Sequence, residues 1–250
     1  MKKLDVSKYT IKDKKIDKNL KIAFLSDLHN TNIINELVKS IDIEKPDLII
    51  FGGDMINESL DEIDVFLELI KKLDKYPMYY TFGNHEEVFD EDDFNKYYNI
   101  ISKTKVTNLY NETIDISKNI RLIGFVSELD KYKKFKSNLV SKDYIIDKVG
   151  KLDKNKYNIL LAHNPLEFNA YVEYNPDLVL SGHVHGGLVI LPVLGALLSP
   201  NFTFFPKYYK GMYEKNNTKM IVSRGLGHSE RIRVRINNNF ELIFIELMKE

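Results

Sequence analysis

Cysteine and tryptophan are both absent from this sequence of 250 residues, and its formal net charge is zero. Without cysteine the chain can form no disulfide, no thiolate metal site and no cysteine nucleophile. The 36 basic residues are balanced by 36 acidic ones, so the overall charge gives no reason to expect nucleic acid as a partner. The hydrophobic content of 44% and the charged content of 29% are typical of a soluble globular protein.

Long apolar runs are also missing. Lys and Asp interrupt every hydrophobic pair in the first 20 residues, which argues against a secretory signal. The longest nearly unbroken apolar run, Leu188 to Leu198, has 11 residues, whereas a membrane-spanning helix needs roughly 20. We therefore expect a cytoplasmic protein that touches a membrane, if at all, only at its surface. The sequence does not indicate an oligomeric state.

Strand-like and helix-like segments alternate through most of the chain. Helical spacing of apolar residues covers 31–44 and 60–73, and more weakly 144–149. Strand patterns cover 21–26, 47–51, 78–82, 106–109, 113–116, 120–125, 158–162 and 177–180. This alternation predicts one α/β domain over residues 1–250 with a mainly parallel core. The strands expected at 219–223, 231–236 and 240–247 would form a second, mixed sheet.

Polar side chains that can bind metal follow five of the predicted strands. Five of the six histidines are placed in this way. Because ligands bind at the carboxyl ends of the strands in open α/β sheets, we expect these side chains to meet at one edge. The residues, in chain order, are Asp27 and His29, Asp54, Asn84 and His85, His163, and His183 and His185.

These donors are oxygen and nitrogen atoms without sulfur, which suits Mn, Fe, Zn or Ni better than Cu(I) or an iron–sulfur cluster. Seven strong ligands are too many for one tetrahedral ion, but they suit two ions that share a carboxylate. Two ions about 3.5–4 Å apart can hold the attacking and leaving oxygens of a phosphoryl displacement and activate a bridging water. Such a site needs no serine or cysteine nucleophile.

The same residues resemble the five-block signature of the calcineurin-like metallophosphoesterases. The blocks are Asp27-Leu28-His29, Gly52-Gly53-Asp54, Gly83-Asn84-His85-Glu86, His163 and Gly182-His183-Val184-His185. The resemblance implies two mixed β-sheets in a sandwich flanked by helices, the four-layer fold of that family.

Two further segments resemble a narrower branch, the small bacterial phosphodiesterases that include lipid-A-precursor (UDP-diacylglucosamine) pyrophosphatases. They are Ser223 to Gly227 and Phe205 to Tyr208. Leu188 stands where relatives in this branch often have a polar residue. This difference bears on the edge that would contact the substrate and not on the metal-ligand positions.

The family resemblance also implies a role for each residue. Asp27, His29 and His185 would hold the first ion, Asn84, His163 and His183 the second, and Asp54 would bridge them. His85 would protonate the leaving oxygen or stabilise charge on the phosphoryl group, and Glu86 would orient His85 or a ligand. The implied reaction is hydrolysis of a phosphodiester or pyrophosphate bond by a metal-bridging hydroxide, with manganese favoured as the metal.

Four of the five arginines lie close together near the end of the chain. Arg224 is our candidate for a substrate-phosphate contact, because arginine binds phosphate bidentately. We interpret Arg231, Arg233 and Arg235 as solvent-facing charges on one face of a strand. His228 matches no ligand block, and we interpret it as a surface loop residue rather than a phosphate contact.

The apolar run 188–198, continued by Phe202, Phe204 and Phe205, has two interpretations. A buried strand and loop is the favoured one. An exposed apolar lip beside the metals would instead suit an amphipathic, lipid-linked phosphoester.

Alternative functions remain at this stage. A non-catalytic scaffold with the same fold is disfavoured, because such a derivative would be expected to lose ligands and all seven are present. Among substrates, a small-molecule or lipid-linked phosphoester is favoured over nucleic acid, since no extended basic track is indicated. A cyclic nucleotide, a sugar-nucleotide pyrophosphate and a phospholipid headgroup all stay open.

Overall fold

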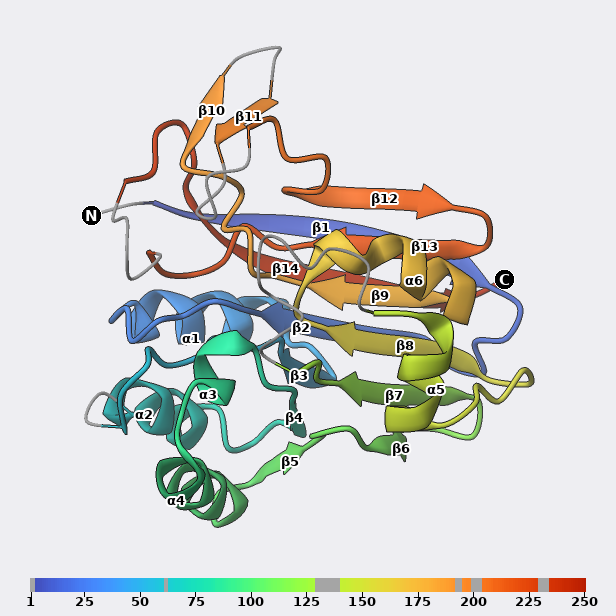
Figure 1. The fold of residues 1–250 in the computed structure, drawn as a ribbon, viewed down its shortest axis with the longest axis horizontal. Helices are drawn as coiled ribbons and strands as arrows, with labels where there is room; N and C mark the ends of the chain where they lie inside the picture. The colour runs from blue at the N-terminus through green and yellow to red at the C-terminus, as the bar shows by residue number, and fades with distance from the viewer. Residues whose placement is uncertain (1–2, 61–62, 129–139, 192–194, 199–203, 229–233) are drawn as a thin grey trace.

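A computed structural model describes residues 3–60, 63–128, 140–191, 195–198, 204–228 and 234–250. Two six-stranded mixed sheets make up most of it (Figure 1). The order in the first sheet is β1 (Leu4–Asp13), β14 (Phe240–Lys249), β2 (Leu20–Leu25), β3 (Leu48–Phe51), β4 (Met78–Tyr80) and β5 (Val106–Asn108). The order in the second is β12 (Gly211–Lys215), β13 (Thr218–Val222), β9 (Leu178–Ser181), β8 (Tyr157–Ala162), β7 (Ile120–Phe125) and β6 (Thr113–Asp115).

Each sheet has a parallel centre. Strands β2 to β5 pair in parallel, as do β7, β8, β9 and β13. Central strands such as β3 and β8 are buried along their whole length, because parallel strands are covered on both faces and are therefore apolar throughout. The parallel centre brings the carboxyl ends of neighbouring strands to one edge of each sheet.

Alternation along these strands divides the apolar side chains between three cores. Phe24 and Ile50 face a core between the two sheets, to which Ile159 contributes from the second sheet. Their neighbours Leu25 and Phe51 face the opposite side of the first sheet. Since successive side chains of a strand point to opposite faces, each central strand contributes to two cores.

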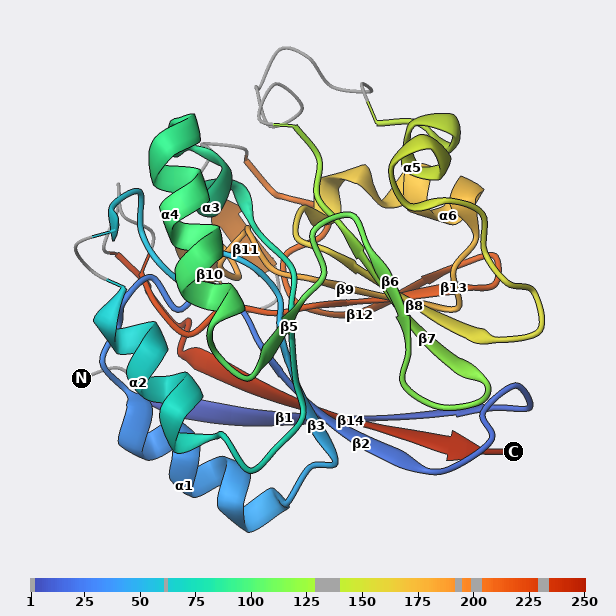
Figure 2. The same cartoon turned by 90° about the horizontal axis from the view of Figure 1, so that it is seen from below.

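Helices cover the two outer faces (Figure 2). The first sheet packs against α1 (Ile34–Glu44), α2 (Asp64–Lys72) and α4 (Glu91–Ser102), and the second against α5 (Lys142–Val149) and α6 (Phe168–Tyr174). A single turn of helix, α3 (Asn84–Glu87), follows β4, and a 3₁₀ turn, Pro165–Glu167, precedes α6. The predicted sandwich of two mixed sheets flanked by helices is confirmed.

Some elements differ from the sequence-based expectation. β14 joins the first sheet, where it is parallel to β1 and antiparallel to β2. Only β13 of the expected C-terminal strands joins the second sheet. The strand expected at 231–236 falls partly outside the described residues, and in the described part only Ile236 forms a β-bridge, to Val189.

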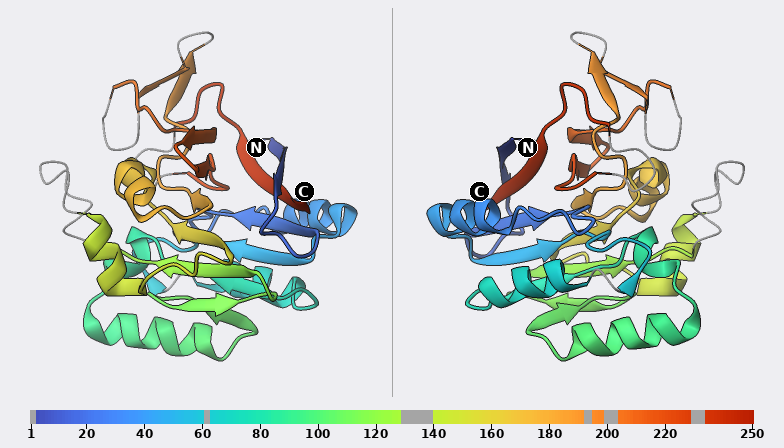
Figure 3. Two further views of the ribbon diagram at one scale, coloured as in Figure 1. Left: turned by 90° about the vertical axis from the view of Figure 1, so that its right-hand side faces the viewer. Right: turned by 90° about the vertical axis from the view of Figure 1, so that its left-hand side faces the viewer.

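A small hairpin adds to the two sheets. It consists of β10 (Val189–Leu191) and β11 (Gly195–Leu198), which pair antiparallel. Figure 3 shows that it stands out from the body of the molecule. None of the helices in the described ranges has the length and apolar composition that crossing a membrane requires.

Candidate metal centre

Five loops bring the predicted ligands together, and both sheets contribute. Asp27 and His29 follow β2, Asp54 follows β3, and Asn84 opens α3 directly after β4. From the second sheet, His163 follows β8, and His183 and His185 follow β9. The two groups meet where the backbone N–H of His183 donates to Asp27 Oδ1 at 2.8 Å. The strand ends of both sheets therefore form one site.

Three groups of these side chains are close enough to hold a metal ion, with ligand atoms within 4.8 Å of one another. The first is Asp27, His29 and His185, and the second is Asp54, His163 and His183. The first has the same members as the set expected for the first ion, and the second combines His163 and His183 of the other expected set with Asp54, the expected bridge. The third group is His29, Asp54 and His85, so distance alone does not separate His85 from the ligands.

Asp54 is central to the arrangement. Its Oδ2 lies 3.0 Å from His163 Nε2, 3.8 Å from His29 Nε2 and 3.9 Å from His85 Nε2. Asn84 is placed by its own contact, since its Oδ1 lies 2.8 Å from His183 Nδ1. The structure thus brings all seven predicted ligands together, and their individual roles stay predictions.

Hydrogen bonds orient two of the imidazoles toward the centre of the site. His163 Nδ1 donates to the Gly52 carbonyl oxygen at 2.7 Å, and His29 Nδ1 lies 3.2 Å from Asn57 Oδ1. With Nδ1 turned to an oxygen acceptor in each ring, Nε2 is the nitrogen that would bind a metal ion, which is the usual arrangement in proteins. The sequence does not predict a role for Asn57, because nothing in the residues around it indicates a hydrogen bond to His29.

Charge in the site is set by burial and by the two carboxylates. Burial lowers the pKa of His29 and of His183 to about 3, so both rings are neutral. Burial also acts to lower the pKa of His163, but the neighbouring Asp54 and Asp27 outweigh it and raise that pKa to about 10. Of these three rings only His163 is therefore protonated beside two fully buried carboxylates, Asp27 and Asp54. The remaining need for positive charge is one that divalent cations fit.

The backbone of the site is in a conformation that most side chains avoid. Five of the seven predicted ligands have a positive φ in the left-handed region, where non-glycine residues are uncommon. Each such residue costs on the order of 1 to 3 kcal/mol, and such residues cluster at functional sites. The five are Asp27 (52°), His29 (45°), Asp54 (53°), His183 (70°) and His185 (50°).

Two glycines allow the loops to approach each other. A Cβ at Gly83 would come within 2.2 Å of Asp54 Oδ1, and a Cβ at Gly182 within 2.2 Å of Asp27 Oδ2. Any other residue at these positions would displace a predicted ligand, which explains why glycine precedes Asn84 and His183.

Glu86 holds the Asp54 loop. Its carboxylate is fully buried and accepts hydrogen bonds from the backbone N–H groups of Asp54 (2.9 Å), Met55 (2.7 Å) and Gly83 (2.7 Å). These contacts fix the strained turn that carries Asp54. The sequence predicts that Glu86 orients His85 or a ligand. Its hydrogen bonds hold the loop that carries the predicted ligand Asp54.

Replacing Glu86 with Ala is expected to lower the free energy of unfolding by roughly 3 kcal/mol or more. Three buried N–H groups would lose a charged acceptor, and each unsatisfied group costs about 1 to 3 kcal/mol. Denaturant unfolding of the metal-free protein measures the change, with Glu173→Ala, at an exposed position on α6, as the control. Unfolding midpoints that stay the same in both variants would contradict a structural role for Glu86.

His85 lies at the rim of the site. Its side chain is 13% exposed, its ring makes an edge contact with the His29 ring, and its Nδ1 is 3.9 Å from Glu58 Oε1. The backbone N–H of His85 donates to Asp54 Oδ1 at 2.9 Å. His85 is thus anchored to the centre while its ring remains accessible to a bound molecule.

The interpretation of Arg235 as a solvent-facing charge is wrong. Its side chain is buried, and its Nη2 lies 3.1 Å from His185 Nδ1 and donates to the Gly227 carbonyl oxygen. The alternation expected of a strand does not hold, because in the described part of this segment only Ile236 forms a bridge. Arg231 and Arg233 lie outside the described residues.

Arg235 also fixes the proton on His185. A guanidinium only donates, so His185 Nδ1 accepts from Arg235 and the ring carries its proton on Nε2. That nitrogen faces His29 Nε2 at 3.2 Å. A metal ion bound to these two nitrogens would have to displace this proton, as is general for protonated ligands.

The other two candidates near the end of the chain are placed differently. Arg224 Nη2 forms ion pairs with Asp5 (3.1 Å) and Glu241 (3.3 Å), and the side chain is 11% exposed. Its role as a phosphate contact stays a prediction. The His228 ring packs edge-on against Phe240, as suits a structural residue.

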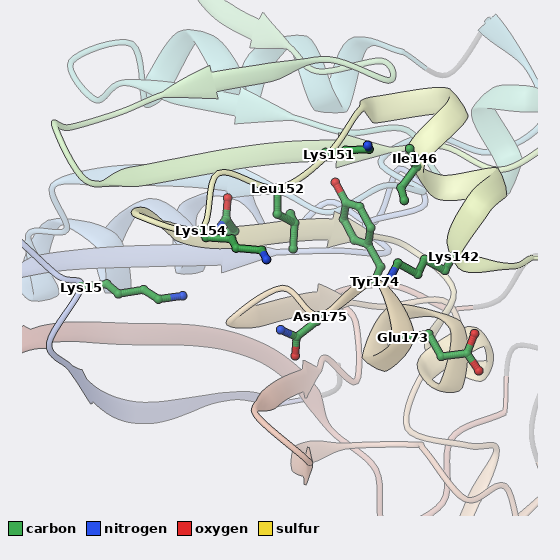
Figure 4. A pocket seen from close by; sticks show the side chains of 10 residues that line it. Lys15, Lys142, Ile146, Lys151, Leu152, Lys154, Glu173, Tyr174 and Asn175 are labelled. Carbon is green, nitrogen blue, oxygen red and sulfur yellow. The ribbon is translucent and has the colours of Figure 1, made fainter.

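A separate groove of about 610 Å³ lies at the opposite strand ends (Figure 4). It is next to Asn158, at the start of β8, whereas the predicted ligand His163 follows the end of that strand. Its lining includes Lys142, Lys151 and Lys154, and also Lys15, which is paired with Asp177. This groove is therefore distinct from the candidate metal centre.

Comparison with known proteins agrees with the geometry. The sequence model of the calcineurin-like phosphoesterases matches residues 20–187, which include all seven predicted ligands. The chain is 26% identical over 236 residues to the uncharacterized metallophosphoesterase YkoQ of Bacillus subtilis, covering 92% of this chain and 84% of YkoQ. It is 25% identical over 236 residues to phosphodiesterase YaeI of Escherichia coli, covering 91% of this chain and 82% of YaeI.

Other relatives are longer, and the chain spans 56% to 59% of the length of three of them. One solved structure superposes with a TM-score of 0.50 at 13% identity, over 81% of this chain and 90% of its own, which bears on the fold alone. The narrower resemblance to lipid-A-precursor pyrophosphatases stays a prediction.

Proposed function

Because this chain belongs to the calcineurin-like phosphoesterase family, we propose that it is a dinuclear metal-dependent hydrolase of phosphodiester or pyrophosphate bonds. The observation that supports this most directly is the pair of ligand groups described above, one around Asp27 and the other around Asp54. The two groups are adjacent, since His163 Nε2 lies 3.0 Å from Asp54 Oδ2 and 3.8 Å from Asp27 Oδ1. Two ions bound by these groups would share Asp54.

The donor set fits the proposed metals. Asp27, His29 and His185 would hold the first ion, and Asn84, His163 and His183 the second. Carboxylate and amide oxygens suit manganese, and imidazole nitrogens also suit iron, zinc and nickel; among these we favour manganese. Two divalent ions in such a site supply positive charge to the phosphoryl oxygens and lower the pKa of a bound water.

The chain's own residues supply the remaining steps. The His85 ring sits at the accessible rim, against His29 and 3.9 Å from Asp54 Oδ2. From there it can give a proton to the leaving oxygen, a contribution that is typically worth 10²- to 10⁴-fold in rate. Glu58 Oε1 lies 3.9 Å from His85 Nδ1, the other nitrogen of the ring.

The proposed substrate is a small-molecule or lipid-linked phosphoester. The E. coli relative is named a phosphodiesterase, which supports a diester. The balanced net charge gives no reason to expect a nucleic acid. Positive charge for an anionic substrate comes instead from the proposed ions.

Removal of metal tests the proposal. After chelation and dialysis the protein is expected to retain less than about 1% of its turnover of bis(p-nitrophenyl) phosphate, because the water loses its activation. Added Mn²⁺ should restore turnover as two ions bind per chain. A panel of monoesters, diesters and pyrophosphates, run with Mn, Fe, Zn and Ni, identifies the bond type. No turnover of any substrate with two ions bound would support the non-catalytic scaffold instead.

A further inference from the structure

The β10–β11 hairpin begins four residues after the predicted ligand His185. Leu188, at its base, donates its N–H to the Leu198 carbonyl oxygen at 2.7 Å and accepts from the Ile236 N–H at 2.9 Å. Figures 1 and 3 show the hairpin projecting from the sandwich at the end toward which β8 and β9 point. A molecule that contacts the hairpin is therefore brought to the metal-centre end of the protein.

Large apolar side chains are exposed on both flanks of this hairpin. Phe204 bridges to Leu198 on β11, while Ile236 bridges to Val189 on β10. The exposed fractions of these flanking residues and their neighbours are 68% for Phe204, 58% for Phe205, 47% for Val234 and 50% for Ile236. Isolated exposed apolar residues are ordinary, but Phe204 and Ile236 are bridged to the two strands of one hairpin, and Phe205 and Val234 are close to them in sequence. We call these four residues the apolar lip.

The lip corrects part of the sequence-based interpretation. Leu188, Ile190 and Ala196 are buried, as the favoured core interpretation expects. Phe204 and Phe205 are exposed, so the continuation of the run is not core. Phe202 and residues 192–194 lie outside the described residues.

The segment that carries Phe204 and Phe205 contains positive charge without negative charge. From Leu178 to Tyr213 the sequence has no aspartate or glutamate, although acidic residues are 36 of 250 overall. Two lysines follow the phenylalanines, and both are exposed, with Lys207 Nζ over the Tyr208 ring and Lys210 Nζ over the Tyr209 ring. Aromatic residues beside lysines, with no acidic residue between, match the surface of a bilayer that contains anionic lipid.

We propose that the apolar lip docks on an anionic phospholipid bilayer, with Phe204 and Phe205 entering the interface and Lys207 and Lys210 facing the headgroups. The exposed area favours a membrane over a second copy of this chain. Two phenylalanines exposed to this extent offer roughly 250 Å² of apolar surface, whereas a stable protein interface buries about 800 Å² on each partner. Reversible membrane binding needs only a few buried apolar groups and some positive charge.

Docking would place a phosphoester of the headgroup region beside the metal centre. This consequence, but not the docking, rests on the proposed function. The lip would thereby select amphipathic substrates that stay in the bilayer, while Asp54 and the other predicted ligands act on the phosphoryl group.

Co-sedimentation of the Mn²⁺-loaded full chain with vesicles, measured without substrate, tests the docking. Vesicles of equal parts phosphatidylglycerol and phosphatidylcholine are expected to bind the wild-type protein. The double substitution Phe204→Ser and Phe205→Ser should weaken binding to the vesicles at least about tenfold. Moving each phenylalanine side chain from water into the bilayer interface contributes strongly to the free energy of binding. Ile43→Ser is the matched control, since Ile43 is also 68% exposed but lies on α1.

Charge is tested in the same way. Lys207→Gln with Lys210→Gln should weaken binding about fivefold or more at low salt, and this loss should shrink at high salt. Lys151→Gln with Lys154→Gln removes the same charge from the opposite groove and should leave binding unchanged.

Equal binding by the wild-type protein and the Phe204/Phe205 variant, or absence of wild-type binding, would overturn the proposal. A dimer in light scattering that dissociates in this variant would also overturn it, by assigning the lip to a second copy. Hydrolysis of a soluble diester by the same variant should stay at the wild-type rate. Failed docking with intact hydrolysis rejects the lip alone, whereas absent hydrolysis in the wild-type protein rejects the proposed function alone.

Discussion

Replacing Asp54 with Asn is expected to lower kcat by at least about a thousandfold, equivalent to about 4 kcal/mol in the activation barrier. Asp54 Oδ2 is within 4 Å of three histidine Nε2 atoms, so one carboxylate connects both ligand groups. The amide keeps the size of the side chain but removes the negative charge that both proposed ions share. Bound metal should therefore fall from two ions per chain to one or fewer.

Metal analysis after dialysis and steady-state kinetics measure these two effects. Asp42→Asn is the control, since Asp42 is an exposed carboxylate on α1 that pairs with Lys75 in the turn after α2. A surface pair contributes at most about 1 kcal/mol, so this control should keep both metal and turnover. An Asp54→Asn protein with two ions bound and normal kcat would contradict the bridging role.

The second large effect is expected from replacing His85 with Ala. Turnover should fall by roughly 10²- to 10⁴-fold, while metal content stays near two ions per chain. The metal measurement decides the role, because His85 lies within ligand distance of His29 and Asp54. Loss of one ion in this variant would make His85 a ligand.

The choice of leaving group distinguishes the two roles considered for His85. A proton donor matters most when the leaving oxygen is basic, so the loss should be larger for an alkyl ester than for a p-nitrophenyl ester. Equal losses on both would instead indicate that His85 stabilises charge on the phosphoryl group.

Much of the framework could be predicted from local sequence. The continuous apolar runs around Ile49 and Leu160 predict buried parallel strands, and the polar residues directly after them mark the site. β1 could not be predicted in this way. Only Ile11 of its ten residues is buried, and its pairing with β14 joins segments more than 200 residues apart in sequence.

Parts of the site depend on contacts that have no local signal. Arg235 shares an alternating pattern with two other arginines, and the pattern favours a solvent-exposed strand. The chain departs from strand geometry there and directs Arg235 to His185. The N–H groups around Glu86 likewise come from a turn whose strained shape at Asp54 is fixed only in the folded protein.

The position of β14 limits how early the first sheet can be completed while the chain is being synthesised. Because β14 lies between β1 and β2, the first sheet has a gap until residues 240–249 have been synthesised. A nascent chain that already contains all seven predicted ligands still has an unpaired β2 edge, which is a template for aggregation. The loop after β2, which carries Asp27 and His29, is therefore supported on both sides only late in translation, and chaperones that shield strand edges should matter most during that interval.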